Sequence, residues 1–361
     1  MKRTDLHVGI CAGYNWDEAT YLAGELWDFL TKVLRVPADF YSATLPVDGL
    51  HFRWDRELTH KKRTPWTTWL FDKDLVIWFG IFPDLLRETP HSKTKHYLVC
   101  LPRTFPPDFQ AEHLALFDRV FCPTQEICRR MSRYLPESQL TYVPWDVSPP
   151  IAECEKDQKT PNRLLVALET VAAKDVDPTI FSMLHMLLDV IPSLEIDILR
   201  GRRWPSTVVA ALEHLLTSHP KNVHLHARPT YQKLTSLYRK ASWVLCADVA
   251  ADVGEPALRA VCLGRPVIAY QAPPYTEILT DQYNAKLTCC EKPSTDTHTA
   301  RITPNSHHLY VGLLEACAKP KLWYHVMGQP WTSVEQRRRQ FTEFWKHTIE
   351  TRAQNCGTMI T

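Results

Sequence analysis

Several cationic residues in the second half of the sequence each follow a short apolar stretch, and together they could hold a diphosphate group. These residues are Lys174, Arg200, Arg202, Arg203 and Arg228, and they are joined by a helix start at Gly254–Glu255. Guanidinium groups and the amides at a helix N-terminus both bind phosphate oxygens. The pattern therefore predicts a diphosphate site. The alternative interpretation is a set of separate surface arginines.

The segment 248–278 would form one wall of such a site. Pro256 is suited to the first turn of a helix, and Gly264 to the left-handed position that follows one. The apolar stretch 266–269 is typical of a strand covered on both faces. Such a helix directs the positive end of its dipole toward residues 251–255. The alternative is an ordinary βαβ unit that binds nothing.

The elements around these residues alternate between strand and helix. In the second half we predict strands at 163–167, 194–199, 223–226, 243–246 and 266–269, and helices at 178–190, 206–218 and 231–239. A long polar loop at 289–308 and helices at 309–317 and 333–351 follow. This order is typical of a Rossmann-like unit, here without a GxGxxG motif, and such units bind ligands beyond the carboxyl ends of their strands.

The first half shows the same alternation. We predict strands at 7–11, 40–43, 74–79, 96–101, 117–124 and 140–143, and helices within 15–34 and at 125–134. This indicates a doubly wound parallel sheet. Asp17 and Glu18 would lie at the start of the first helix, facing the end of the first strand. They could act in catalysis, or they could only complement the helix dipole.

Basic and aromatic residues alternate within 51–71. They include Arg53, Trp54, Lys61, Lys62, Arg63 and Trp66. Cations that meet phosphates and rings that stack on bases would suit nucleic acid. The same residues could also bind sugar rings, or the tryptophans could simply pack on the domain.

Composition limits the remaining possibilities. A chain of 361 residues is long for one core, and a net charge of +2 does not by itself imply a polyanion partner. No apolar run reaches the roughly 20 residues of a membrane span, and no signal peptide is expected. Eleven cysteines without a C-x-x-C pair fit a reducing cytoplasm, and the sixteen histidines show no familiar metal-binding spacing. We expect domains at 1–148 and 162–330, a Pro-rich, charged linker at 149–161, and a terminal helix and tail at 331–361.

Five segments resemble the GT-B nucleotide-sugar glycosyltransferases, and specifically the large retaining family of that fold. They are FDRVFCPT (117–124), VPWD (143–146), the predicted strand at 163–167 with the following Lys174, KNVHLHARPTYQKLTSLYRKASWVLCADV (221–249) and EPALRAVCLGRPVIAYQAPPYTEIL (255–279). The resemblance covers most of 117–344. It implies an α/β fold of two Rossmann-like domains facing a cleft, with the C-terminal helix packing back toward the first domain.

The resemblance also implies a donor site in the second domain. Its donor-binding residues would be Lys174, Thr170, Arg200, Arg202, Arg228, Asp252, Gly254, Glu255 and Glu277. The two glutamates that the family spaces as E-x(7)-E fall on Ala251 and Arg259 here. Asp252 or Glu255 could replace the first, but Arg259 cannot accept hydrogen bonds from ribose hydroxyls.

The implied reaction is sugar transfer with retention of configuration. The nucleotide sugar is a co-substrate, and no cofactor or metal is implied. We predict Glu255, Asp17 and Glu18 as catalytic residues. The acceptor would lie on the first domain, near Arg103 and the basic-aromatic residues Arg53, Trp54, Lys61, Lys62, Arg63 and Trp66.

The segment GICAGYNWDEATYLAGEL (9–26), with HFRWD (51–55), is similar to bacteriophage glycosyltransferases that modify DNA bases. This implies DNA as a partner and a hydroxymethylated pyrimidine as the acceptor, in a host cytoplasm. Two alternatives are open. One is a glycosyltransferase for a surface glycan, a lipid or a small molecule. The other is a GT-B protein that binds without catalysis, because the family's glutamates are substituted.

Overall fold

The computed structural model divides the chain into two compact units. Unit 1 comprises Met1–Asp146 and Gln336–Thr361, and unit 2 comprises Val147–Glu335. The structure describes residues 6–13, 18–43, 64–89, 93–105, 109–146, 162–168, 175–201, 204–227, 229–281, 284–294, 301–318 and 332–356. None of the helices in these ranges is long and apolar enough to cross a lipid bilayer.

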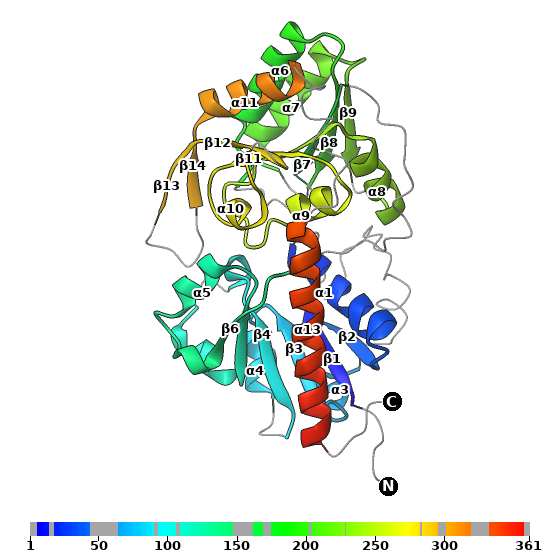
Figure 1. The fold of residues 1–361 in the computed structure, drawn as a ribbon, viewed down its shortest axis with the longest axis vertical. Coiled ribbons are helices and arrows are strands. Elements are labelled where there is room, and N and C mark those ends of the chain that lie inside the picture. Colours follow the sequence, from blue (N-terminus) through cyan, green and yellow to red (C-terminus); the bar gives the residue numbers. More distant parts are fainter. Residues whose placement is uncertain are drawn as a thin grey trace. The chain divides into compact units, whose positions relative to one another are not determined.

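Unit 1 is built on a six-stranded parallel sheet in the order β2-β1-β3-β4-β5-β6 (Figure 1). Its strands are β1 (Val8–Ala12), β2 (Ala38–Ser42), β3 (Leu75–Phe79), β4 (Lys95–Val99), β5 (Arg119–Cys122) and β6 (Leu140–Tyr142). Its helices are α1 (Glu18–Asp28), α3 (Trp66–Leu70), α4 (Pro83–Arg87), α5 (Gln125–Met131) and, from Gln336 onward, α13 (Thr332–Asn355). The π-helical turn η1 (Phe29–Val33) extends α1, and short 3-10 turns form η2 (Pro102–Thr104), η3 (Ala111–Leu116) and η4 (Glu137–Gln139).

The central strand β3 is apolar throughout because helices cover both faces of the sheet. Val76 and Trp78 belong to the core cluster that contains the tryptophans of α3. Phe79, on the opposite face, meets Trp145 edge to face with ring centroids 5.6 Å apart. Successive side chains of a strand point to opposite faces, so a strand covered on both sides loses the polar alternation of an exposed one.

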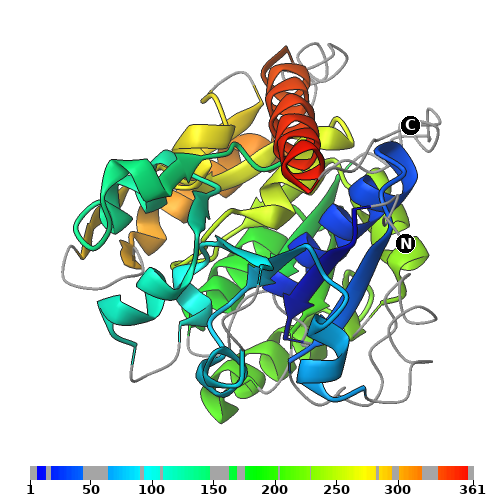
Figure 2. The ribbon, with the colours of Figure 1, turned by 90° about the horizontal axis from the view of Figure 1, so that it is seen from below.

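Helix α13, red in Figures 1 and 2, returns the end of the chain to unit 1. Phe341, Trp345 and Ile349 are buried along one side of it. The Trp345 ring lies 5.5 Å from that of Phe121 on β5. Near the other end of the helix, Arg352 donates hydrogen bonds to backbone carbonyls of unit 1. The expected packing of the terminal helix on the first domain is therefore confirmed.

Unit 2 contains a second six-stranded parallel sheet, in the order β12-β11-β10-β7-β8-β9. Its strands are β7 (Arg163–Leu168), β8 (Glu195–Arg200), β9 (Val223–Ala227), β10 (Trp243–Cys246), β11 (Val267–Tyr270) and β12 (Ala285–Thr288). Its helices are α6 (Thr179–Val190), α7 (Ser206–Ser218), α8 (Tyr231–Lys240), α9 (Glu255–Cys262), α10 (Tyr275–Ile278) and α11 (Ser306–Ala318). The expectation of two Rossmann-like sheets is confirmed.

Helices cover both faces of the second sheet as well (Figure 1). One face forms a continuous core with α6, α7 and α11. Helix α8 packs on β7 from the other face, and α9 packs there on β10 and β11. This layering explains the apolar stretches that the sequence shows at β7, β10 and β11.

The predicted loop 289–308 is wrong. Strands β13 (Cys290–Ser294) and β14 (Arg301–Pro304) form an antiparallel pair within it, and α11 begins at Ser306. The pair is anchored rather than free, because Ile302 is buried and its N–H donates to the Val249 carbonyl over 2.9 Å. Polar side chains on a two-stranded ribbon give little hydrophobic pattern, which is why the sequence alone suggests a loop.

Candidate functional site

The strand order of unit 2 places a topological switch point between β7 and β10. The chain proceeds outward from β7 through β8 to β9, and then starts again on the other side of β7 with β10. Both strands run in the same direction and pair side by side, so their carboxyl ends Leu168 and Cys246 lie at the same edge. Open α/β sheets bind ligands at this position, because the loops diverge there and leave room.

The loop after β10 leads into α9 through Gly254. Its backbone has φ 72° and ψ 43°, a left-handed conformation that side-chain-bearing residues rarely adopt. A Cβ at this position would also lie 3.2 Å from Pro274 and 3.3 Å from both Tyr275 and Ile278. Gly254 therefore serves two needs at once: it turns the chain into the helix, and it lets the loop after β11 approach closely.

The first turn of α9 is closed by the Gly254 carbonyl. This oxygen accepts hydrogen bonds from the amides of Ala257 at 2.9 Å and Leu258 at 3.1 Å. Pro256 has no N–H. An anion at this helix start would therefore interact with the positive end of the helix dipole and with the amides of the loop that precedes α9. Few amides of the first helical turn would be left to bind it.

Glu255 and Arg259 form a buried ion pair on α9. They are 0% and 2% exposed, and Arg259 Nε donates to Glu255 Oε1 over 2.7 Å. The terminal nitrogen Nη2 of Arg259 donates to the same oxygen. On its other side the guanidinium lies 5.8 Å from the ring centroid of Tyr238 in α8. The carboxylate predicted as catalytic is therefore turned into the protein interior, where it neutralises Arg259.

Two further carboxylates lie in the loop between β10 and α9. Asp248 and Asp252 are both buried. Asp248 Oδ1 accepts a hydrogen bond from the Ala250 N–H over 2.9 Å, which fixes the first turn of the loop. The hydrogen bond from Ile302 to Val249 holds the same loop from outside. The loop is thus positioned by contacts on several sides, as a binding loop requires.

Arg200 is the described cation at this edge. It ends β8, pairs in register with Leu168 at the end of β7, and is partly exposed. Its guanidinium lies 5.7 Å from the ring centroid of Trp204. Glu277, also partly exposed, lies in α10 after the cis bond Pro273–Pro274. The structure thus places Arg200, Asp252, Gly254 and Glu277 in segments that follow the carboxyl ends of the sheet.

Several predicted site residues lie outside the described residues. In unit 2 these are Thr170, Lys174, Arg202 and Arg228, and in unit 1 they are Asp17, Arg53, Trp54, Lys61, Lys62 and Arg63. The predicted linker 149–161 lies outside them as well.

In unit 1, Trp66 belongs to the core and not to an acceptor surface. It is 3% exposed, and its ring lies 5.0 Å from that of Tyr41 and 5.3 Å from that of Trp69. Its indole N–H donates to the Thr89 hydroxyl over 3.2 Å. A ring enclosed in this way cannot stack on a base, so for Trp66 the packing interpretation is the correct one.

Glu18 and Arg103 both follow strands of the first sheet. Glu18 is buried in the first turn of α1, next in the chain after β1, and Arg103 is partly exposed in η2 after β4. The Thr20 hydroxyl donates to the Gly13 carbonyl over 2.9 Å and so ties the start of α1 to the end of β1. Both interpretations of Glu18, catalysis and dipole complementation, fit this position.

The partner of Glu255 is the feature of this site that sequence reasoning missed. Glu255 and Arg259 are four residues apart on a helix, a spacing at which an acid and a base face each other. The spacing is present in the sequence, but the family resemblance marks Arg259 only as a substituted residue.

Neither a protein-family model nor a curated protein sequence matches the chain significantly. Solved structures do match. A glycosyltransferase from Rickettsia africae has a TM-score of 0.67 at 10% identity, over 98% of this chain and 100% of that one. HepE from Anabaena, in complex with UDP, has a TM-score of 0.65 at 9% identity, over 95% of this chain and 99% of HepE.

TarM from S. aureus has a TM-score of 0.56 at 13% identity, over 78% of this chain. The match covers 55% of TarM, so this chain spans about half the length of that protein. At such identities the likeness concerns the fold. The chain has the two-domain, double-Rossmann GT-B architecture found in these proteins.

Proposed function

We propose that this GT-B chain is a glycosyltransferase, which moves a sugar from a nucleotide-sugar donor to an acceptor hydroxyl. One observation carries the proposal. In the parallel sheet of unit 2, Arg200 ends β8, and the helix that starts after Gly254 follows β10, so both lie toward the same edge of the sheet. The full-length match to the Rickettsia glycosyltransferase supports it.

The diphosphate of the donor would bind at the carboxyl edge of the unit 2 sheet. Arg200 would hold one phosphate, and the dipole of α9 would favour the negative charge. Lys174, which follows β7 in the chain, would supply a second cation. HepE has been solved with UDP and glucose, so UDP-glucose is the first donor to test.

Transfer would proceed with retention of configuration. The bond from the anomeric carbon to the diphosphate oxygen breaks, and a new bond forms from the same face to the acceptor oxygen. The acceptor proton passes to the departing diphosphate. The cations matter most in this step, because negative charge grows on the leaving group in the transition state.

Donor binding can be tested by calorimetry with UDP and with UDP-glucose. Replacing Arg200 by Ala removes a charged hydrogen-bond donor, so we expect binding about 10- to 100-fold weaker. Lys174→Ala should weaken binding in the same way. Lys221→Ala is the control, because this exposed lysine precedes β9 at the opposite edge of the sheet. Unchanged affinity in both Arg200→Ala and Lys174→Ala would refute the placement of the pocket.

For the acceptor we propose a hydroxymethylated pyrimidine in DNA. The basic and aromatic residues within 51–63 support this, since they combine phosphate-binding and base-stacking groups. The decisive experiment incubates the protein with hydroxymethylated DNA and a panel of nucleotide sugars, followed by nucleoside mass spectrometry. If the sugar is transferred to a glycan, a lipid or a small molecule and not to DNA, the proposed acceptor is wrong. The proposed glycosyltransferase activity would still hold.

A second candidate is a protein that binds the nucleotide sugar without transferring the sugar. The Glu255–Arg259 pair favours it, because the acid nearest the helix start is already occupied by a buried arginine. Tight donor binding with neither hydrolysis nor transfer across the acceptor panel would select this candidate.

A further inference from the structure

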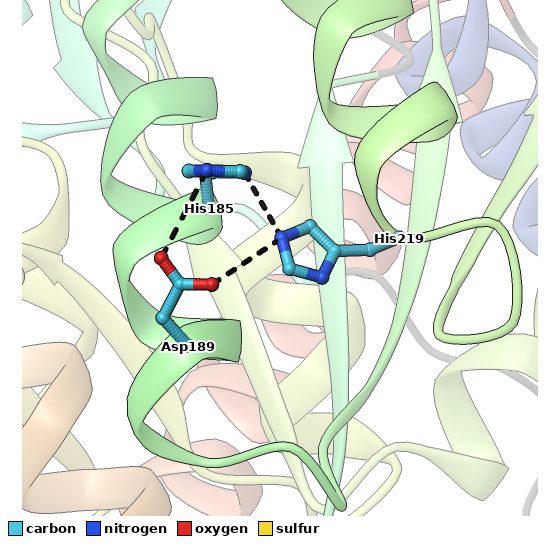
Figure 3. A group of neighbouring side chains, drawn as sticks. All are labelled: His185, Asp189 and His219. Atoms are coloured by element: carbon cyan, nitrogen blue, oxygen red, sulfur yellow. Dashed lines mark hydrogen bonds and ion pairs between the residues drawn. The ribbon is translucent and has the colours of Figure 1, made fainter.

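Two histidines and an aspartate from α6 and the end of α7 lie together in unit 2 (Figure 3). His185 and Asp189 are one helical turn apart on α6, so both side chains project from the same side of that helix. His219 is the first residue after α7. Among the residues that the structure describes, no other group of three such side chains comes close enough to share an ion.

The distances match those between the ligands of one metal ion. His219 Nε2 lies 2.9 Å from His185 Nδ1 and 3.8 Å from Asp189 Oδ1. One ligand atom from each residue can be chosen so that all three lie within 4.8 Å of one another. Zinc bonds of about 2.0–2.1 Å place two tetrahedral ligands about 3.4 Å apart, so on binding the hydrogen bond between the two histidines would open and both rings would turn toward the ion.

The backbone around His219 is fixed before any ion binds. Its N–H donates to the Leu215 carbonyl over 3.0 Å, and its carbonyl accepts from the amides of Asn222 and Val223, both over 3.1 Å. The side chains of His185, Asp189 and His219 are 31%, 60% and 16% exposed. The backbone that carries one imidazole is therefore held in place, and the carboxylate side is open to water, which could enter and complete the coordination.

The position indicates a structural role. Asp189 lies near the end of α6 just before β8, and His219 lies just before β9. This is the amino-terminal edge of the sheet, opposite to the edge where the donor would bind. An ion here would join the ends of α6 and α7 without touching the reaction.

We propose that His185, Asp189 and His219 bind one divalent transition-metal ion such as Zn²⁺, and that this ion stabilises unit 2. Imidazole nitrogens suit ions of intermediate softness such as Zn²⁺, Ni²⁺ and Cu²⁺, whereas Mg²⁺ and Ca²⁺ prefer oxygen ligands. The proposal does not depend on the enzymatic function.

The test uses the full chain, free of affinity tags and treated with a chelator. Isothermal titration with ZnCl₂ should show one high-affinity site per chain. At a Zn²⁺ concentration about 100 times the Kd, the Tm of unit 2 should rise by about 5 to 10 °C. MgCl₂ at the same concentration should not raise it. Co²⁺ should give visible absorption bands of a tetrahedral nitrogen and oxygen site.

Variants separate this site from adventitious binding. Asp189→Asn and His219→Gln should each abolish the Zn²⁺-dependent rise in Tm, while the Tm without metal changes little in Asp189→Asn because that side chain is exposed. His307→Ala, an exposed histidine of α11 outside the cluster, should keep the full rise. If the wild type shows no rise, the histidines only hydrogen-bond each other. If His219→Gln keeps the rise, Zn²⁺ binds elsewhere. Either result overturns the proposal.

Discussion

The Glu255–Arg259 pair allows a direct test of how the start of α9 is held. Glu255→Gln removes one charge from a pair whose side chains are 1% and 3% exposed. At the 2.7 Å separation of Nε and Oε1, and at an effective dielectric constant of about 20, the attraction is about 6 kcal/mol. The cost of desolvating the two groups offsets much of this attraction. When the carboxylate charge is removed, the guanidinium stays buried, and the attraction no longer offsets the cost of its desolvation. Breaking a buried pair in this way costs about 3–5 kcal/mol.

A double-mutant cycle measures the pair itself. We expect Glu255→Leu and Arg259→Met each to lower the free energy of unfolding by about 3–5 kcal/mol. The double variant Glu255→Leu/Arg259→Met, which fills the space with apolar groups, should recover most of this loss, because replacing a whole buried pair is often neutral. Urea unfolding followed by tryptophan fluorescence gives the free energies.

The control is a pair with the same spacing on the surface. Lys346 and Glu350 of α13 are also four residues apart, but their side chains are 62% and 45% exposed. Removing Glu350 should change stability very little, because solvent screens the charges. If the Glu255 and Arg259 losses simply add in the double variant, the two groups are not coupled and the argument fails.

Three further predictions concern stability. Burial alone would raise the pKa of Asp197, but hydrogen bonds from His226 and Arg163 outweigh it and hold the pKa below its usual range. The stability that this carboxylate contributes is therefore present above about pH 4 and is lost as the pH falls through the lowered pKa. In Asp197→Asn, the free energy of unfolding from urea curves should depend less on pH in this range. Trp345→Ala should cost about 3–5 kcal/mol by emptying a fully buried site, read as a lower unfolding midpoint. Gly254→Ala should cost about 1–3 kcal/mol because of the left-handed backbone, read as a lower midpoint of urea unfolding at pH 7; an unchanged midpoint would contradict the backbone argument.

Strands with continuous apolar sequence were predictable. The predicted strand at 243–246 matches β10, and the helix at 206–218 matches α7, because both carry a clear pattern of burial. Strand β12 was missed, since Ala285–Thr288 lies at the sheet edge and two of its four residues are only partly buried. Edge strands of this kind have too little apolar pattern to be recognised from sequence.

The helix start of the candidate site was predictable from the sequence, but its internal partners were not. The helix start at Gly254 followed from local residue preferences, whereas the enclosure of Trp66 by Tyr41 and Trp69 depends on contacts from β2 and from the same short helix. His219 and His185 likewise meet only because α6 and α7 lie side by side. Contacts between distant segments carry no signal in a single sequence.

The return of α13 to unit 1 sets the order in which the two units are completed during synthesis. Phe121 contacts Trp345, and Trp145 contacts Phe341. Both residues therefore lack these aromatic neighbours until residues 341–345 have left the ribosome. Unit 2, which lies between the two parts of unit 1 in the chain, is synthesised completely before that point. Unit 2 is therefore available as a whole before unit 1 is, although domains usually become complete from the amino terminus onward during synthesis.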